Sequence, residues 1–174
     1  MKLPIVIYPD RRLKSVSEPV SVFGPELHTL LDNMYETMIS SNGIGLAAIQ
    51  VGRPLQVLIL NLPDEENMQH KEDLIEIINP EIIFKEDSVF YQEGCLSIPG
   101  FYEEIERYAR VTVKHQDRHG NTCTIEAEEL LSIAIQHEIE HLQGKVFIEN
   151  LSYARRKKFE KEYKKAQKEK KRAQ

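Results

Sequence analysis

The chain has 174 residues, of which 41% are hydrophobic, and a formal net charge of -5. This size and apolar content predict one globular domain with a sizeable core, and no apolar run approaches the roughly 20 residues that span a bilayer. Two cysteines are too few for a disulfide framework, and the first ten residues lack a signal-peptide pattern, so we expect a cytoplasmic protein without a membrane anchor.

The N-terminal half predicts one helix followed by strands. Residues 25–41 begin with Pro25, which suits a first helical turn. Apolar residues then recur at the spacing of an amphipathic helix: Leu27, Leu30, Leu31, Met34 and Met38. The apolar run 55–62 has the length of a strand. Residues 76–84 predict strand structure interrupted by a turn at Asn79-Pro80.

The C-terminal half predicts a hairpin and a core helix. Apolar and polar residues alternate over 110–117 as in a half-buried strand. A turn follows, and residues 122–127 predict a second strand that completes a hairpin. Residues 128–143 are apolar on nearly all sides, and Gly144 stands where a helix cap is expected. The order of elements lacks βαβ alternation, so we expect an α+β fold. In that fold, mostly antiparallel strands pack around this central helix.

The tail of the chain is strongly basic. Residues 154–174 contain 11 Lys or Arg against 3 Glu, while the preceding 153 residues contain 12 basic and 25 acidic residues. The composition predicts a helix that protrudes from the body, with Tyr153, Phe159 and Tyr163 as its few apolar anchors. Such a charge run is either a solubilising face or a contact surface for nucleic acid.

The segment "IQHEIEHLQG" (135–144) places four ionisable groups in an apolar run. On a helix, His137 and His141 project from one face and can share one metal ion. Glu138 is displaced by one residue, which suits a general base acting on water held by the metal. The alternatives are a buried ion-pair network and an exposed helix face. The apolar surroundings argue against exposure.

A catalytic metal site needs a third protein ligand and an open position. Cys95 is the best candidate, because it follows Gly94 in a glycine-containing, loop-like segment. The usual alternative for an isolated cysteine is an inert buried thiol, which is what we expect for Cys123 within its strand.

The segment "NGIGLAAIQV" (42–51) contains two glycines and two alanines around apolar residues. Small residues of this kind mark a close approach of the backbone to another group. That group is either another part of the chain or an extended substrate that pairs with a strand edge. Gln50 places a neutral amide donor at the end of this segment.

Three segments together resemble the peptide deformylase family: "GIGLAAIQ" (43–50), "EGCLS" (93–97) and "QHEIEH" (136–141). They occur in this order at comparable separations, and the similarity extends over most of the chain. The resemblance implies removal of the formyl group from the N-terminal formyl-methionine of newly made bacterial polypeptides, with release of formate. We expect a catalytic domain over residues 1–152 and a basic helical extension over residues 153–174.

The resemblance also implies the roles of individual residues. Cys95, His137 and His141 are the expected metal ligands, and Glu138 is the expected general acid and base. The family's physiological metal is Fe(II), while zinc, nickel or cobalt can occupy the site. Two donors are expected to face the developing oxyanion, and other residues to bind the substrate. The donors are the Gln50 side chain and the Leu96 backbone N–H; the substrate residues are Gly43, Ile44, Gly45, Glu93, Gly94, Leu130, Ile133 and Ala134.

Two positions depart from the family's pattern. Glu140 stands where the family usually has Asp, and we expect it to pair with Arg107. Tyr102 stands where many relatives have Arg, on the rim of the expected substrate site. Both changes alter side chains near the chemistry without removing any of the expected ligands.

Two other functions compete with a deformylase. A zinc endopeptidase shares HExxH but needs a ligand downstream, where no His follows His141 and the nearest acid is Glu149. An inactive homologue would instead use the basic tail as a binding module. The resemblance implies that this tail docks on the ribosome near the peptide exit, and we expect a monomer that acts on nascent peptides.

Overall fold

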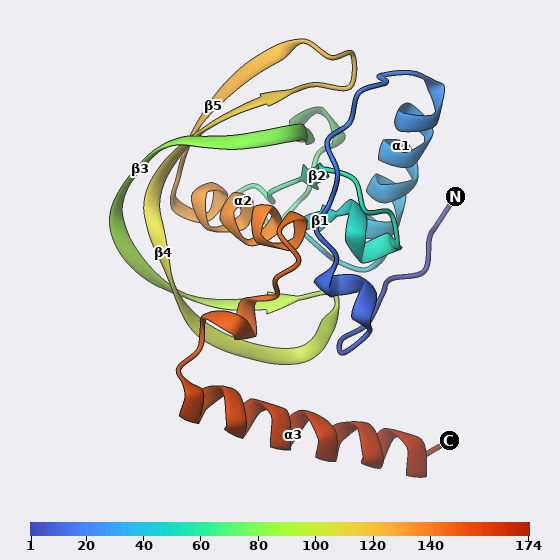
Figure 1. Ribbon diagram of the computed structural model, residues 1–174, viewed down its shortest axis with the longest axis vertical. Helices are drawn as coiled ribbons and strands as arrows, with labels where there is room; N and C mark the ends of the chain where they lie inside the picture. Colours follow the sequence, from blue (N-terminus) through green and yellow to red (C-terminus); the bar gives the residue numbers. More distant parts are fainter.

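The computed structural model describes all 174 residues and has the expected α+β fold (Figure 1). One antiparallel sheet contains five strands in chain order: β1 (Gly45–Ala47), β2 (Val57–Leu60), β3 (Ile75–Cys95), β4 (Ile98–Gln116) and β5 (Thr122–Glu128). Three α-helices accompany it: α1 (Pro25–Ser40), α2 (Glu129–Leu142) and α3 (Tyr153–Arg172). Four short 3-10 helices connect these elements: η1 (Arg11–Lys14), η2 (Ala48–Val51), η3 (Lys71–Asp73) and η4 (Phe147–Asn150).

The long β3–β4 hairpin curves around α2, which lies at the centre of the molecule (Figure 1). The helix is buried along most of its length because its sequence is apolar on nearly all sides. Ile135 and Ile139 pack into a core formed with Leu58, Ile77 and Val113 of the sheet. The prediction of a central helix among antiparallel strands is therefore confirmed.

The prediction of a turn at Asn79-Pro80 is wrong, because β3 continues through these residues. Asn79 adopts a φ of 53°, and the pairing with β4 shifts register between Ile78 and Glu81. Asparagine tolerates this left-handed backbone conformation, so the strand accommodates a bulge without ending. The Asn79 side chain also bonds both backbone groups of Val20, at 2.8 and 2.9 Å, which fixes the bulge to the N-terminal segment.

Helix α1 covers the β1–β2 end of the sheet, as its amphipathic pattern predicts. Its apolar residues, including Met34 and Met38, pack against Leu46 and Ile59. Strand β1 pairs with β2 in the register Gly45 to Leu60, and it is the edge strand of the sheet. One side of β1 therefore remains open for another extended segment.

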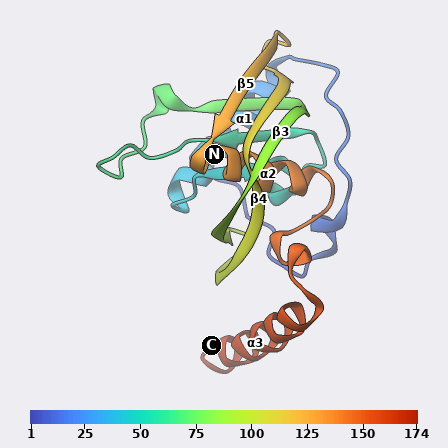
Figure 2. The same cartoon turned by 90° about the vertical axis from the view of Figure 1, so that its left-hand side faces the viewer.

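Helix α3 lies apart from α2, across the end of the β3–β4 hairpin (Figure 2). Phe159 and Tyr163 face inward and are buried, whereas Tyr153, also expected as an anchor, is 78% exposed. The two buried rings contact Phe101 and Tyr8, and the Tyr163 hydroxyl donates to the Tyr8 carbonyl. No helix in this fold is both long and apolar enough to cross a bilayer.

Candidate metal centre and substrate cleft

Helix α2 brings the two histidines together. Their spacing of four residues places both rings on one helix face, and their Nε2 atoms lie 3.2 Å apart. His141 is fully buried and His137 is 8% exposed. The exposed-helix alternative is therefore wrong, and the two ring nitrogens converge inside the protein.

Cys95 completes this group from the other side of the cleft. It is the last residue of β3, and a two-residue turn of Leu96 and Ser97 follows before β4 begins. The Cys95 sulfur lies 3.4 Å from Nε2 of His141, and the three donor atoms lie within 4.8 Å of one another. Cys123 lies on β5 outside this group. The hairpin turn thus carries the thiol to the helix.

These donors fit a divalent transition-metal ion. One thiolate and two imidazoles are ligands that such ions favour, and three protein ligands leave a position open for catalysis. His137 Nδ1 lies 2.8 Å from Oε1 of Glu93, so it carries the proton and leaves the Nε2 lone pair facing the site. The zinc-endopeptidase alternative would need Glu149 as the third ligand, but the third convergent donor is Cys95, and Glu149 accepts a bond from the Val146 N–H.

A buried ion-pair network supports His137 from behind. The Arg107 guanidinium donates to both carboxylate oxygens of Glu93, at 2.6 and 2.8 Å, and to Oε1 of Glu140 at 2.5 Å. The expected pairing of Glu140 with Arg107 is thus present, and Asn150 donates to the other oxygen of Glu140 at 2.9 Å. Burial alone would raise the pKa of Glu93, but its bonds from Arg107 and His137 outweigh burial and lower that pKa.

Glu138 lies beside the histidines and lacks a polar partner for one oxygen. It is 4% exposed, its Oε2 atom accepts no hydrogen bond, and its Oε1 atom lies 3.7 Å from Nε2 of His137. Desolvation raises the pKa of this carboxyl to about 7. A carboxyl group with this pKa can both accept and return a proton near neutral pH.

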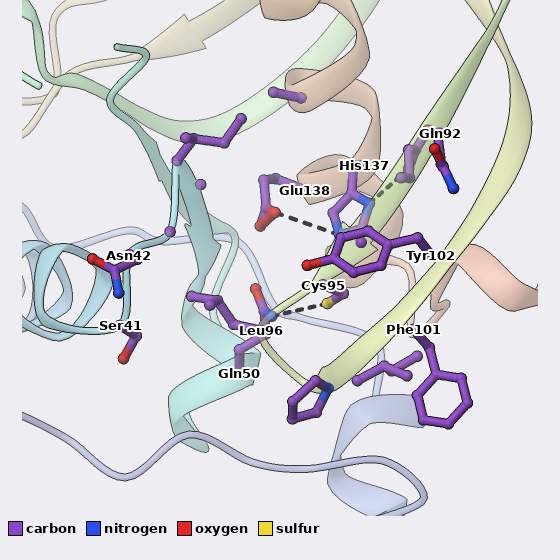
Figure 3. Close-up of a pocket in the computed structure, with 18 of the residues that line it drawn as sticks. Ser41, Asn42, Gln50, Gln92, Cys95, Leu96, Phe101, Tyr102, His137 and Glu138 are labelled. Atoms are coloured by element: carbon purple, nitrogen blue, oxygen red, sulfur yellow. Dashed lines mark hydrogen bonds and ion pairs between the residues drawn. The ribbon is translucent and has the colours of Figure 1, made fainter. Parts of the chain in front are cut away.

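Gln50 and Leu96 lie on the opposite wall (Figure 3). Gln50 is buried in η2, where its Oε1 atom accepts a bond of 2.9 Å from the Ala47 N–H. This contact turns its Nε2 atom toward the site, where it donates to Ser97 Oγ at 3.1 Å and lies 3.4 Å from Cys95 Sγ. The sequence did not predict that Ser97 orients this amide, although Ser97 belongs to the "EGCLS" segment.

The glycines of the β1 segment lie against the site. A methyl group at Gly43 would come within 2.6 Å of Leu96 Cδ1, and one at Gly45 would lie 3.2 Å from Oε1 of Glu138. The backbone of this segment therefore approaches other groups closely, as the sequence predicted, and those groups are Leu96 and Glu138 of the same chain. The open edge of β1 faces the same cleft.

The cleft has a volume of about 490 Å³. Leu130 and Ala134 of α2 line it, whereas Ile133 is buried outside its lining. It also includes residues not expected from the sequence, among them Tyr91 and Phe101. All the other predicted substrate-binding residues lie around it: Gly43, Ile44, Gly45, Glu93 and Gly94.

An α+β fold that sets a Cys/His/His group beside a buried glutamate in a cleft defines a metal-dependent hydrolase. The model of the polypeptide deformylase family matches residues 2–157. A peptide deformylase from Helicobacter pylori is 55% identical over 170 residues, covering 98% of each chain. The chain therefore belongs to the polypeptide deformylase family, and its activity is that of a peptide deformylase.

Solved structures show the same fold. A peptide deformylase from Legionella pneumophila superimposes with a TM-score of 0.89 at 37% identity, covering 99% of each chain. A class I type b peptide deformylase from Acinetobacter baumannii matches with a TM-score of 0.80 at 30% identity, covering 87% of this chain and 99% of the other. The antiparallel sheet around α2 is thus the architecture of this family.

Proposed function

We propose that the chain removes the formyl group from N-terminal formyl-methionine of nascent polypeptides, releasing formate and a free amino terminus. The convergence of Cys95, His137 and His141 beside Glu138 carries this proposal. The Acinetobacter baumannii relative was solved with Met-Ala-Ser bound, which has the sequence of a deformylated peptide. A cleft of about 490 Å³ has room for the first residues of such a chain.

Cys95, His137 and His141 would hold the metal, which we propose is Fe(II) in the cell, with zinc, nickel or cobalt able to replace it. When bound, the ion supplies Lewis acidity that makes water a nucleophile near neutral pH. The Glu93 contact keeps the His137 ring in the orientation that this ligand set needs.

The chain's own residues would manage the protons and the developing charge. Glu138 accepts a proton from the attacking water and passes it to the leaving amine. Its buried, unpartnered oxygen and raised pKa support both roles. The Gln50 amide and the Leu96 N–H donate to the formyl oxygen as it gains charge, and loss of one such donor typically costs about 10²–10³ in rate.

The substrate backbone would run along the open edge of β1. Gly43, Ile44 and Gly45 offer backbone groups there, and Glu93 and Gly94 form the facing wall. The methionine side chain would lie on apolar α2, where Leu130 and Ala134 line the cleft. The prediction that Ile133 also lines the methionine pocket stays a prediction, because this residue is buried and does not line the cleft.

We also propose that α3 docks on the ribosome, as the extension of a catalytic domain formed by residues 1–152. Burial of Phe159 and Tyr163 leaves its basic residues on the outer faces. Replacement of Lys161, Lys165 and Lys168 by Glu should abolish co-sedimentation with ribosomes at low salt while the fold remains intact. Unchanged co-sedimentation would contradict docking through α3. We expect a bacterial cytoplasmic monomer.

Formate release tests the proposed activity. Protein prepared anaerobically and loaded with one equivalent of Fe(II) should release formate from formyl-Met-Ala-Ser. Mass spectrometry should show the intact tripeptide and no internal cleavage. Internal cleavage would instead support an endopeptidase. Absence of turnover in fully metallated protein would support a binding module.

A further inference from the structure

The connection between β2 and β3, residues 61–74, reaches the substrate cleft through one side chain. Gln69 donates from its Nε2 atom to the Gly43 carbonyl at 2.9 Å and to the Asn61 carbonyl at 2.7 Å. Gly43 lines the cleft, whereas Gln69 does not. A residue outside the cleft therefore holds a segment that lines it.

This contact lies where the pairing of β1 with β2 ends. The strand register stops at Gly45, and one further bond of 2.8 Å joins the Asn61 N–H to the Ile44 carbonyl. Gly43, the residue before, makes no backbone bond to the β2 side. The Gln69 amide bridges the carbonyls of Gly43 and Asn61 instead, so it supplies bonds that the strand pairing lacks.

The connection that carries Gln69 is ordered by Asp64. One carboxylate oxygen accepts the backbone N–H groups of Glu66 and Met68, both at 2.9 Å, and the other lies 2.7 Å from Nε2 of His70. These bonds, the one from Met68 most, lower the pKa of the Asp64 carboxyl. The exposed turn that they close is followed by Gln69, whose side chain is half-buried. The amide is thus presented to Gly43 by a folded segment.

Gly43 is fixed on its other sides as well. Its N–H donates to the Met38 carbonyl at 2.9 Å, and a methyl group on it would come within 2.6 Å of Leu96 Cδ1. We propose that Gln69 is a positioning residue for deformylation, which keeps the Gly43–Gly45 backbone where an extended formyl peptide pairs with it. This inference rests on the proposed function, because it assumes that the peptide runs along the open edge of β1.

The test compares the wild type with Gln69→Glu and Gln69→Ala. The carboxylate of Gln69→Glu keeps the shape of the side chain but lacks both N–H groups. With Fe(II)-loaded protein and formyl-Met-Ala-Ser, both variants should raise KM about 2- to 10-fold, the worth of one or two hydrogen bonds, and change kcat by less than about twofold. Formyl-methionine offers less backbone to the edge, so its KM should rise less.

A second readout does not depend on turnover. The Ile44 N–H belongs to the same peptide group as the Gly43 carbonyl, so its NMR signal in zinc-loaded protein should shift in both Gln69 variants. Met68→Ala is the matched control, because Met68 is the adjacent residue, is 55% exposed and bonds to Asp64 through its backbone. This variant should keep the wild-type KM and the wild-type Ile44 signal.

Three outcomes would overturn the role of Gln69 and leave the deformylase activity standing. They are an unchanged KM in both Gln69 variants, an equal rise in KM for formyl-methionine and the tripeptide, and a lower unfolding midpoint with KM unaltered, which would show a purely structural role. Absence of formate release by the fully metallated wild type from either substrate would overturn the proposed function together with this inference.

Discussion

Oε1 of Glu93 lies 2.8 Å from Nδ1 of His137, on the side of the ring that faces away from Cys95 and His141. This contact orients the ring and selects the tautomer whose Nε2 lone pair faces the metal site. Arg107 holds Glu93 through two bonds, so the metal site is supported by a buried charge pair.

Glu93→Gln should weaken metal binding by about 10- to 100-fold, because loss of the carboxylate lowers the basicity of the His137 ring and fixes its orientation less firmly. Competition with a chromophoric chelator measures the affinity. Glu104→Gln, a change at an exposed position of β4, is the control and should leave it unaltered. Equal metal affinity for Glu93→Gln and the wild type would contradict this role.

Glu138→Gln should lower kcat/KM by about 10²–10⁴, because the amide cannot accept and return a proton. The bound metal should remain, since Glu138 is not one of the three convergent donors. Formate release and metal analysis on the same preparation check both expectations. A variant that keeps its metal and wild-type activity would exclude Glu138 as the general base.

Gly45→Ala should lower kcat by roughly tenfold or more. The added methyl group would lie 3.0 Å from Leu60 Cδ2 and 3.2 Å from Oε1 of Glu138, so the carboxylate must move. The shift needed is a few tenths of an ångström, and since a displacement of about 1 Å can cost on the order of 10²-fold, a loss nearer tenfold is expected. Gly24→Ala is the control, because its methyl group would have no neighbour nearer than 3.9 Å. Equal kcat for both variants would show that Glu138 tolerates displacement.

Phe159→Ala should destabilise the fold by about 3–5 kcal/mol, because it removes a ring that is 1% exposed from the contact between α3 and the body. Tyr153→Ala on the same helix, at a residue 78% exposed, should change stability by less than about 1 kcal/mol. Urea unfolding followed by circular dichroism measures both. Similar urea midpoints for Phe159→Ala and Tyr153→Ala would mean that α3 is not anchored through Phe159.

The sequence predicted the parts of the molecule that depend on local patterns. The four-residue spacing of His137 and His141 and the apolar run around them predicted both the helix and the shared ligand face. The choice of Cys95 over Cys123 followed from its glycine-containing segment and from the family resemblance. The spatial convergence of these residues is confirmed.

Other features depended on tertiary contacts and could not be read from local patterns. The sequence around Asn79 was read as a turn, because a residue with left-handed backbone geometry occurs in turns and in β-bulges alike. Only the pairing of β3 with β4 shows that Asn79 belongs to a bulge. The contact of Arg107 with Glu93 joins residues that do not face one another in the strand register. Tyr153 and Phe159 have similar apolar character, and only the docking of α3 decides which one is buried.

Anomalous diffraction from anaerobically prepared, metal-loaded crystals tests the central claim most directly. We predict one metal peak bonded to the Cys95 sulfur at about 2.3 Å and to both imidazole rings of α2, with Glu138 beside the remaining open position. A metal peak away from Cys95, or a Cys95 thiol pointing out of the cleft in the loaded protein, would contradict this account.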